Sequence, residues 1–177
     1  VLAARLLWDK GIGEFVDAAR DLKKKVSNVR FVLVGNPDLD NPASIVKETI
    51  NSWEKENIIE WWGHHKEMAP VFHAAHIACL PSYREGLPKV LIEAASCGLP
   101  IVSTDVPGCR EIVRDEFNGI LVPKCDSVSL SNALLRLIED PDLRSKMGKS
   151  GRELVLDKFS SKHIISKTLN IYKELLK

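Results

Sequence analysis

The sequence has little of what marks several large classes of protein. Its 177 residues hold four cysteines, which are widely spaced and form no Cys-x-x-Cys pair. This argues against a disulfide framework or a zinc knuckle and fits a reducing, cytoplasmic environment. No apolar run is long enough to span a bilayer, and no secretory signal segment is visible. The net charge of +1 gives no overall field that favours nucleic acid as a partner.

A glycine-rich cofactor signature is also missing. Gly-Ile-Gly at residues 11–13 follows an expected strand, but the third glycine of a dinucleotide fingerprint is absent. With 45% hydrophobic and 28% charged residues, the chain suits one globular domain, residues 1–177, and shows no internal repeat. Because it opens directly in "VLAAR", without Met or a polar leader, we expect a piece of a longer polypeptide.

What the sequence does contain is a regular alternation of short apolar runs and helical patterns. The apolar runs predict strands at residues 1–5, 29–35, 58–63, 76–81, 99–105 and 118–123. The helical patterns cover residues 13–25, 45–56, 67–75, 88–98, 127–139, 141–158 and 160–177, with a short segment at 109–113. This alternation predicts an α/β fold, a Rossmann-like doubly wound parallel sheet of about six strands with helices on both faces. Ligands of such sheets bind at the carboxyl edge.

Two basic side chains lie at the first of these strand ends. Arg5 ends the first strand, and Lys10 stands just before the first helix, next to a glycine. Two cations beside a helix start can form an anion-binding site. Solvated surface charges are the ordinary alternative for Arg and Lys, and the spacing alone weighs the two interpretations about evenly.

A second group of candidates lies in "REGLPKVLIEAASCG", residues 84–98. Proline favours the first position of a helix, so we expect the helix to open at Pro88, directly after Gly86 and Leu87. The first backbone N–H groups of a helix have no partner within it and lie at the positive end of its dipole. This helix start would therefore suit a phosphate group.

Glu93 stands in the middle of the apolar run of the same helix, so we expect a buried carboxylate that needs a partner. A vicinal diol, such as a ribose, could donate two hydrogen bonds to it. The alternative is an i,i+4 pair with Lys89, which contributes only about 0.2–0.5 kcal/mol. That pair leaves Glu85, just before the helix, unexplained.

The segment "EGLPKVLIE" resembles the E-x7-E motif of the family-4 retaining glycosyltransferases, which are nucleotide-sugar enzymes of GT-B fold. "ARLLWDKG" is similar to the first-strand element of that family, although Ala4 stands where a glycine is common. "LPIVSTDVPGCREIV" and "NGILVP" also resemble family segments, in the same order. The likeness covers only the C-terminal, donor-binding half of that architecture, and the N-terminal, acceptor-binding half is absent. It is closest to bacterial enzymes of capsule, lipopolysaccharide and glycan-lipid synthesis.

The resemblance implies a role for each candidate residue. Arg5 and Lys10 would bind the donor diphosphate and stabilise its charge as it leaves. Glu93 would hold the nucleotide ribose, and Glu85 would contact the transferred sugar. The remaining implied contacts, to the nucleobase and to the sugar and phosphates, come from Gly63, His64, Gly86, Leu87 and Pro88.

The implied reaction is transfer of a hexosyl or N-acetylhexosaminyl group from a nucleotide sugar, with UDP as the expected nucleotide, to a glycan or polyprenyl-linked acceptor. No metal or cofactor is expected, because basic side chains and a helix terminus neutralise the leaving diphosphate. His64 and His65 are adjacent and should face different ways, so a shared metal is not expected either. The isolated domain should transfer nothing by itself.

Two other functions stay open at this point: a GT-B epimerase acting on a UDP-sugar, and a nucleotide-sugar-binding module that has lost transfer. Residues 141–177 hold nine Lys or Arg against four Asp or Glu. We interpret this tail as a solvated helical face, with weak peripheral contact to an anionic membrane as the alternative. The expected location is the cytoplasm, including the inner face of the membrane.

Overall fold

The computed structural model describes residues 1–176 and contains a six-stranded sheet with strand order β3-β2-β1-β4-β5-β6. All neighbouring strands pair in parallel. The strands are β1 (Leu2–Ala3), β2 (Val32–Val34), β3 (Glu60–Gly63), β4 (Ala78–Leu80), β5 (Ile101–Thr104) and β6 (Gly119–Val122). The predicted Rossmann-like α/β sheet is thereby confirmed, although each strand is shorter than its apolar run.

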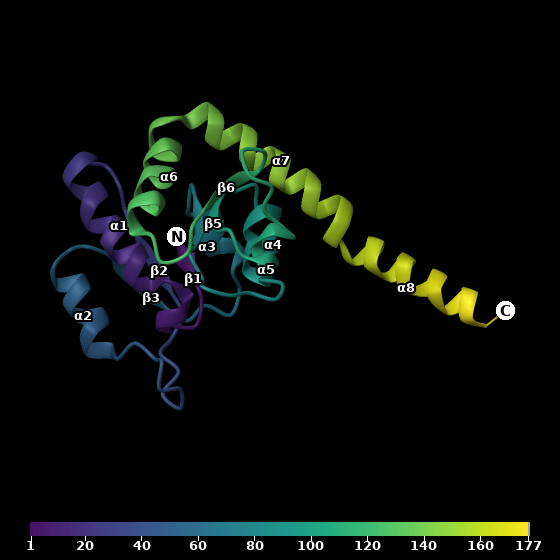
Figure 1. Ribbon diagram of the computed structural model, residues 1–177, viewed down its shortest axis with the longest axis horizontal. Helices are drawn as coiled ribbons and strands as arrows, with labels where there is room; N and C mark the ends of the chain where they lie inside the picture. Colours follow the sequence, from purple (N-terminus) through teal and green to yellow (C-terminus); the bar gives the residue numbers. More distant parts are fainter. Residues whose placement is uncertain (177) are drawn as a thin grey trace.

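Helices cover both faces of this sheet, as Figure 1 shows. On one face α1 packs against α6, and on the other α4 packs against α7. The helical elements are the 3-10 turn η1 (Trp8–Lys10) and the α-helices α1 (Ile12–Lys25), α2 (Lys47–Lys55), α3 (Ala69–His73), α4 (Lys89–Ser96), α5 (Pro107–Arg110), α6 (Ser127–Glu139), α7 (Pro141–Phe159) and α8 (Ser161–Leu175).

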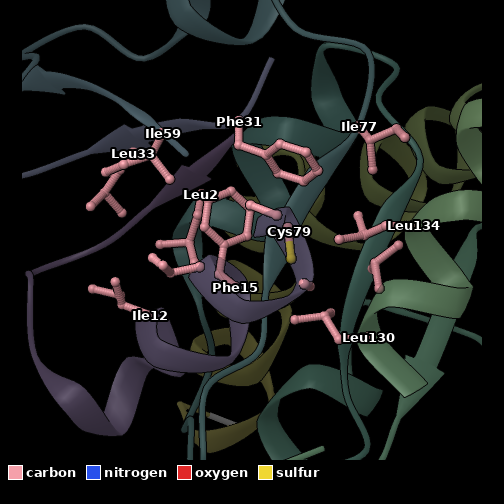
Figure 2. Packing of buried hydrophobic residues seen from close by; sticks show 14 of the residues in the cluster. Leu2, Ile12, Phe15, Phe31, Leu33, Ile59, Ile77, Cys79, Leu130 and Leu134 are labelled. Atoms are coloured by element: carbon pink, nitrogen blue, oxygen red, sulfur yellow. The ribbon is translucent and has the colours of Figure 1, made fainter. Parts of the chain in front are cut away.

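Strands β1, β2, β4 and β5 are buried along their whole length, whereas β3, at the edge of the sheet, is half-buried. In β4 and β5, successive side chains enter different core clusters. Cys79 and Val102 belong to the cluster that includes Phe15 of α1, whereas Ala78 and Ile101 belong to the cluster on the α4 side. Figure 2 shows Cys79 among the packed side chains of the first cluster. Burial raises the pKa of the Cys79 thiol to about 12, so it stays a neutral core residue.

Two glycines allow strand ends to approach each other at the carboxyl edge. Gly35 has φ +133°, and a Cβ there would lie 1.8 Å from the backbone oxygen of Ala4. Gly11, at the start of α1, has φ +71°, and its Cβ would lie 2.0 Å from the backbone oxygen of Pro81. Any side chain at either position would push these segments apart. The second contact holds η1, which carries Lys10, directly against the end of β4.

Helix α2 begins later than the sequence predicts, because the residues before it pair with the segment that follows β1. Trp8 N–H donates to the Ala43 carbonyl at 3.0 Å, and Ile45 N–H donates to the Leu6 carbonyl at 2.8 Å. These bonds flank an antiparallel bridge between Leu7 and Ser44, so the helix starts only at Lys47. The pairing fixes the β2–α2 loop beside the β1–η1 turn, where Arg5 lies.

Helix α8 extends away from the rest of the chain in Figure 1 and has no buried residue. One side of it exposes large apolar side chains, namely Ile164, Ile165, Leu169, Ile171, Tyr172 and Leu175. Of the helices within residues 1–176, none combines the length and the apolar character needed to cross a membrane.

Candidate functional site

Two hollows open at the carboxyl edge of the sheet. The first hollow has a volume of about 500 Å³ and is lined by residues at the ends of β1, β2 and β3 and by α4. The second hollow, about 760 Å³, is lined by residues 83–85 and by residues that follow β5 and β6. Of the expected site residues, Arg5, His64 and Glu93 line the first hollow and Glu85 lines the second, at the edge where ligands bind to sheets of this kind. The other expected residues line neither hollow, namely Lys10, Gly63, Gly86, Leu87 and Pro88.

The first hollow brings together Arg5, His64 and Glu93, which the sequence places in three separate segments. Arg5 follows β1, and its guanidinium donates to Asp38 Oδ2 at 2.9 Å. The Arg5 side chain is 65% exposed, so this ion pair is screened by water and gives little stability. Asp38 was not predicted from the sequence, because an acidic residue in a turn-rich loop carries no distinguishing signal.

Glu93 is exposed, so the expectation that it is buried is wrong. The face of α4 that enters the core carries Leu91, Ala94 and Ala95, and Glu93 instead lines the first hollow. Within residues 1–176 the Glu93 carboxylate forms neither an ion pair nor a hydrogen bond, and the alternative pair with Lys89 is not made. Its two oxygens therefore face the hollow without a protein partner.

Glu85 is in a different state. Its Oε1 accepts a hydrogen bond from Lys10 Nζ at 2.7 Å, and the two side chains are only 14% and 18% exposed. Glu85 also lines the second hollow. The pair joins the turn after β1 to the loop after β4, which lie side by side because β1 and β4 are neighbours in the sheet.

A network of hydrogen bonds fixes the loop that carries Glu85. Tyr83 N–H donates to the Asp9 carbonyl at 2.9 Å, next to Lys10 in the chain. The Tyr83 hydroxyl donates to Glu14 Oε1 at 2.6 Å, and burial together with the Glu14 carboxylate raises the pKa of Tyr83 above its ordinary value. This network was not predicted from the sequence, because its members come from three segments.

Helix α5 supports the same loop from the other side. A Cβ on Gly108 would lie 2.3 Å from the Glu85 carbonyl oxygen and 2.4 Å from that of Gly86. The hydroxyl of Thr104, at the end of β5, donates to the Ser82 carbonyl. The segment from Ser82 to Gly86 is thus held by both flanking elements.

The start of α4 differs in detail from the prediction. The helix begins at Lys89, and Pro88 takes the extended cap position, with φ −73° and ψ 97°, rather than the first helical position. No side chain caps α4, and Gly86 and Leu87 are exposed in front of it. The first N–H groups of α4 therefore have no side-chain acceptor.

Gly63 ends β3 with φ +68°, and its carbonyl accepts the Gly35 N–H at 2.8 Å. His64 and His65 are exposed and both line the first hollow, and the His65 ring lies beside the ring of Trp62. The strand has ended at Gly63, so the alternation of a strand no longer applies to them. In the described part of the chain, no group of three His, Cys, Asp or Glu side chains could hold a metal ion.

Comparison with known proteins gives a consistent set of relatives. Residues 1–154 match the sequence model of the family described as "Glycosyl transferases group 1". The chain is 32% identical, over its whole length, to an N,N'-diacetylbacillosaminyl-diphospho-undecaprenol alpha-1,3-N-acetylgalactosaminyltransferase of Campylobacter jejuni. It is 27% identical, over 98% of its length, to the capsular polysaccharide biosynthesis glycosyltransferase CapM of Staphylococcus aureus. It spans only 45% of the length of each of these two curated relatives.

Solved structures share the fold. The sucrose-phosphate synthase of Thermosynechococcus elongatus aligns with a TM-score of 0.85 and 28% identity, over 99% of this chain and 44% of that one. HepE of Anabaena, solved in complex with UDP, aligns with a TM-score of 0.82 and 24% identity, over 98% of this chain and 47% of that one. The second likeness concerns the fold alone.

Proposed function

The chain belongs to the glycosyl transferases group 1 family, and on that premise we propose that it is the C-terminal, donor-binding half of a retaining GT-B glycosyltransferase. The observation that carries the proposal is the placement of Arg5, His64 and Glu93 around the first hollow, with the Lys10–Glu85 pair nearby at the same edge. This arrangement offers two cations for a diphosphate and two carboxylates for hydroxyl groups.

Each part of a nucleotide sugar has a counterpart in this arrangement. The nucleobase lies by Gly63 and His64, and the exposed Glu93 carboxylate accepts hydrogen bonds from the ribose diol. Arg5 and Lys10 bind the diphosphate. Charge-assisted hydrogen bonds of this kind are about twice as strong as neutral ones.

Catalysis in this proposal rests on electrostatic stabilisation. The acceptor oxygen bonds to the anomeric carbon as the bond between that carbon and the diphosphate oxygen breaks, and the acceptor's proton leaves with the nucleoside diphosphate. Arg5, Lys10 and the N–H groups that open α4 stabilise the negative charge that develops on the diphosphate. Glu85 accepts hydrogen bonds from hydroxyl groups of the transferred sugar. We propose that these groups serve without a bound metal or cofactor.

The proposed donor is a UDP-sugar that carries a hexosyl or N-acetylhexosaminyl group. The proposed acceptor is a glycan or a polyprenyl-linked sugar of bacterial cell-surface polysaccharide synthesis, bound by an N-terminal half. Support comes from the relatives, because the Campylobacter jejuni enzyme is named for a diphospho-undecaprenol substrate and CapM for capsular polysaccharide. A cytoplasmic location at the inner membrane face follows from such an acceptor, and the basic, apolar-faced α8 suits weak peripheral contact.

Titration calorimetry with UDP, GDP and uridine tests the binding step. We expect UDP to bind more tightly than uridine, because only UDP engages Arg5 and Lys10. Absence of binding by any nucleoside diphosphate at millimolar concentration would contradict the proposal. A turnover assay on the full-length enzyme, with a panel of UDP-sugars and lipid-linked acceptors, then separates transfer from epimerisation and from binding without chemistry.

A further inference from the structure

Lys10 and Glu85 form an ion pair with each other, although the proposed function assigns Lys10 to the diphosphate of the donor and Glu85 to its sugar. The Lys10 ammonium donates to Glu85 Oε1 at 2.7 Å, and it has no other hydrogen-bond acceptor within the described part of the chain. The side chains are 18% and 14% exposed, so the two charges are largely removed from water. Each charge is therefore neutralised by the other.

This pair is built into the fold and does not depend on two flexible surface side chains meeting. Tyr83 N–H holds the loop of Glu85 to the Asp9 carbonyl, one residue before Lys10, at 2.9 Å. Gly11, one residue after Lys10, is in close contact with the Pro81 carbonyl. The backbones on both sides of the pair are thus fixed against each other, so the ion pair reforms whenever nothing competes for it.

Occupancy by a ligand changes the balance of these charges. A diphosphate that takes Lys10 leaves the Glu85 carboxylate largely buried and without its counterion, which is unfavourable. A sugar that donates hydroxyl hydrogen bonds to Glu85 restores a partner to it. A complete donor therefore satisfies both residues, whereas a bare nucleoside diphosphate satisfies Lys10 alone.

We propose that Glu85 makes the site discriminate between donor and product, because it takes Lys10 back as its counterion whenever the sugar is absent. This inference rests on the proposed function and deepens it. Glu85 is then more than a sugar contact: it weakens the binding of the nucleoside diphosphate that remains after transfer. The consequence for the full-length enzyme is easier release of that product and weaker product inhibition.

The test is calorimetric titration of the full-length enzyme with UDP, comparing wild type with Glu85→Gln. Glutamine keeps the size of the side chain but no longer neutralises Lys10. We expect UDP to bind roughly three- to tenfold more tightly to the variant, since a charged hydrogen bond no longer competes for Lys10. Uridine, which lacks the diphosphate, should bind both proteins equally. Unchanged or weakened UDP binding would overturn the inference.

Tighter binding could also arise from the removal of a negative charge that repels the diphosphate directly. A double-mutant cycle with Lys10→Gln separates the two causes. If Glu85 acts through Lys10, Glu85→Gln has no effect on UDP affinity in the Lys10→Gln background. An equal gain of affinity in both backgrounds would overturn the inference.

A matched control is Glu116→Gln, which breaks an ion pair with Arg136 of similar length, 2.6 Å, outside both hollows. It should leave UDP affinity unchanged. Product inhibition gives a second readout: with a donor that the enzyme turns over, UDP should inhibit Glu85→Gln more strongly than wild type. If wild type binds no nucleoside diphosphate at all, the proposed function fails. If wild type and Glu85→Gln bind UDP alike, only this inference fails.

Discussion

Glu85 and Glu93 are the two carboxylates of one short motif, yet the structure places them in opposite states. Glu85 is on a loop, is 14% exposed, and is paired with Lys10. Glu93 is on helix α4, is exposed, and has no ionic partner among residues 1–176. The loop residue is the more tightly held of the two, because η1, β5 and α5 all fix its loop. Glu93 is thus free to accept a ligand, whereas Glu85 is held by its ion pair with Lys10.

The largest effect on turnover should come from Lys10, the ion-pair partner of Glu85. Lys10→Gln removes a cation from the diphosphate and also leaves Glu85 without its counterion. Loss of a group that stabilises transition-state charge typically lowers turnover by roughly a hundred- to a thousandfold. Arg5→Gln should lower it less, because Arg5 is 65% exposed and its charge is screened. Steady-state kinetics of the full-length enzyme measures both losses of turnover. Equal losses would contradict the prediction that the more buried cation contributes more.

Glu93 should give the next effect, in binding rather than in turnover. Glu93→Gln should weaken UDP and UDP-sugar alike, by about 1.5–3 kcal/mol if a charged hydrogen bond to the ribose is lost. The sign is opposite to that expected for Glu85→Gln, although the substitution is the same. Calorimetry with UDP and 2′-deoxy-UDP on wild type and variant forms a cycle in which strong coupling supports the diol contact. If the effects of Glu93→Gln and of removing the 2′-hydroxyl simply add, Glu93 does not contact the ribose.

A smaller effect is expected from the network that restrains Glu85. Tyr83→Phe removes the 2.6 Å hydrogen bond to Glu14 and should loosen the loop without touching the first hollow. A typical hydrogen bond contributes about 0.5–1.5 kcal/mol, so we expect kcat to fall several-fold. UDP affinity should change little. A parallel loss of UDP affinity would show that the two sides of the site are not independent.

The same network makes the stability of the fold depend on pH. The pKa of Tyr83 is raised in the folded protein, chiefly by burial and then by Glu14. A raised pKa favours the protonated phenol, so this contribution to stability is complete below the unfolded pKa of about 10 and is lost as the pH rises through the folded value. Thermal unfolding followed above pH 10 should therefore be less steeply pH-dependent in Tyr83→Phe than in wild type.

Sequence patterns predicted the fold well because each strand lies between two helical layers and reads as an apolar run. The bounds were less accurate: β1 ends at Ala3, and Arg5 lies outside it, in a turn in which Leu7 N–H donates to the Arg5 carbonyl at 2.8 Å. Residue patterns singled out Arg5, Lys10, Glu85 and Glu93, and the family resemblance supplied their roles and added His64. The structure brought Arg5, His64 and Glu93 to one hollow.

Two features of the site could not be read from the sequence. The Lys10–Glu85 contact depends on β1 and β4 being neighbours, and alternation of strands and helices does not give the strand order. The apolar neighbours of Glu93 made it look buried in the sequence, but Val90 and Ile92 are themselves only half-buried. In an eight-residue helix, apolar residues that line a hollow cannot be told from residues that enter the core.

The smallest expected effect is at Lys89, and it decides how Glu93 is to be understood. Lys89 and Glu93 are one helical turn apart, so an i,i+4 pair is the simple alternative to a ligand contact, but the structure shows both side chains exposed and no ion pair between them. Even a formed pair of this kind contributes only about 0.2–0.5 kcal/mol. Lys89→Ala should therefore change UDP affinity less than twofold, while Glu93→Gln lowers it at least tenfold, as calorimetry under identical salt would measure. If Lys89→Ala reproduced the loss seen in Glu93→Gln, the pair would be real in solution, and Glu93 would act by orienting the helix start. An unchanged affinity would agree with the structure, in which Glu93 is exposed and has no ionic partner among residues 1–176.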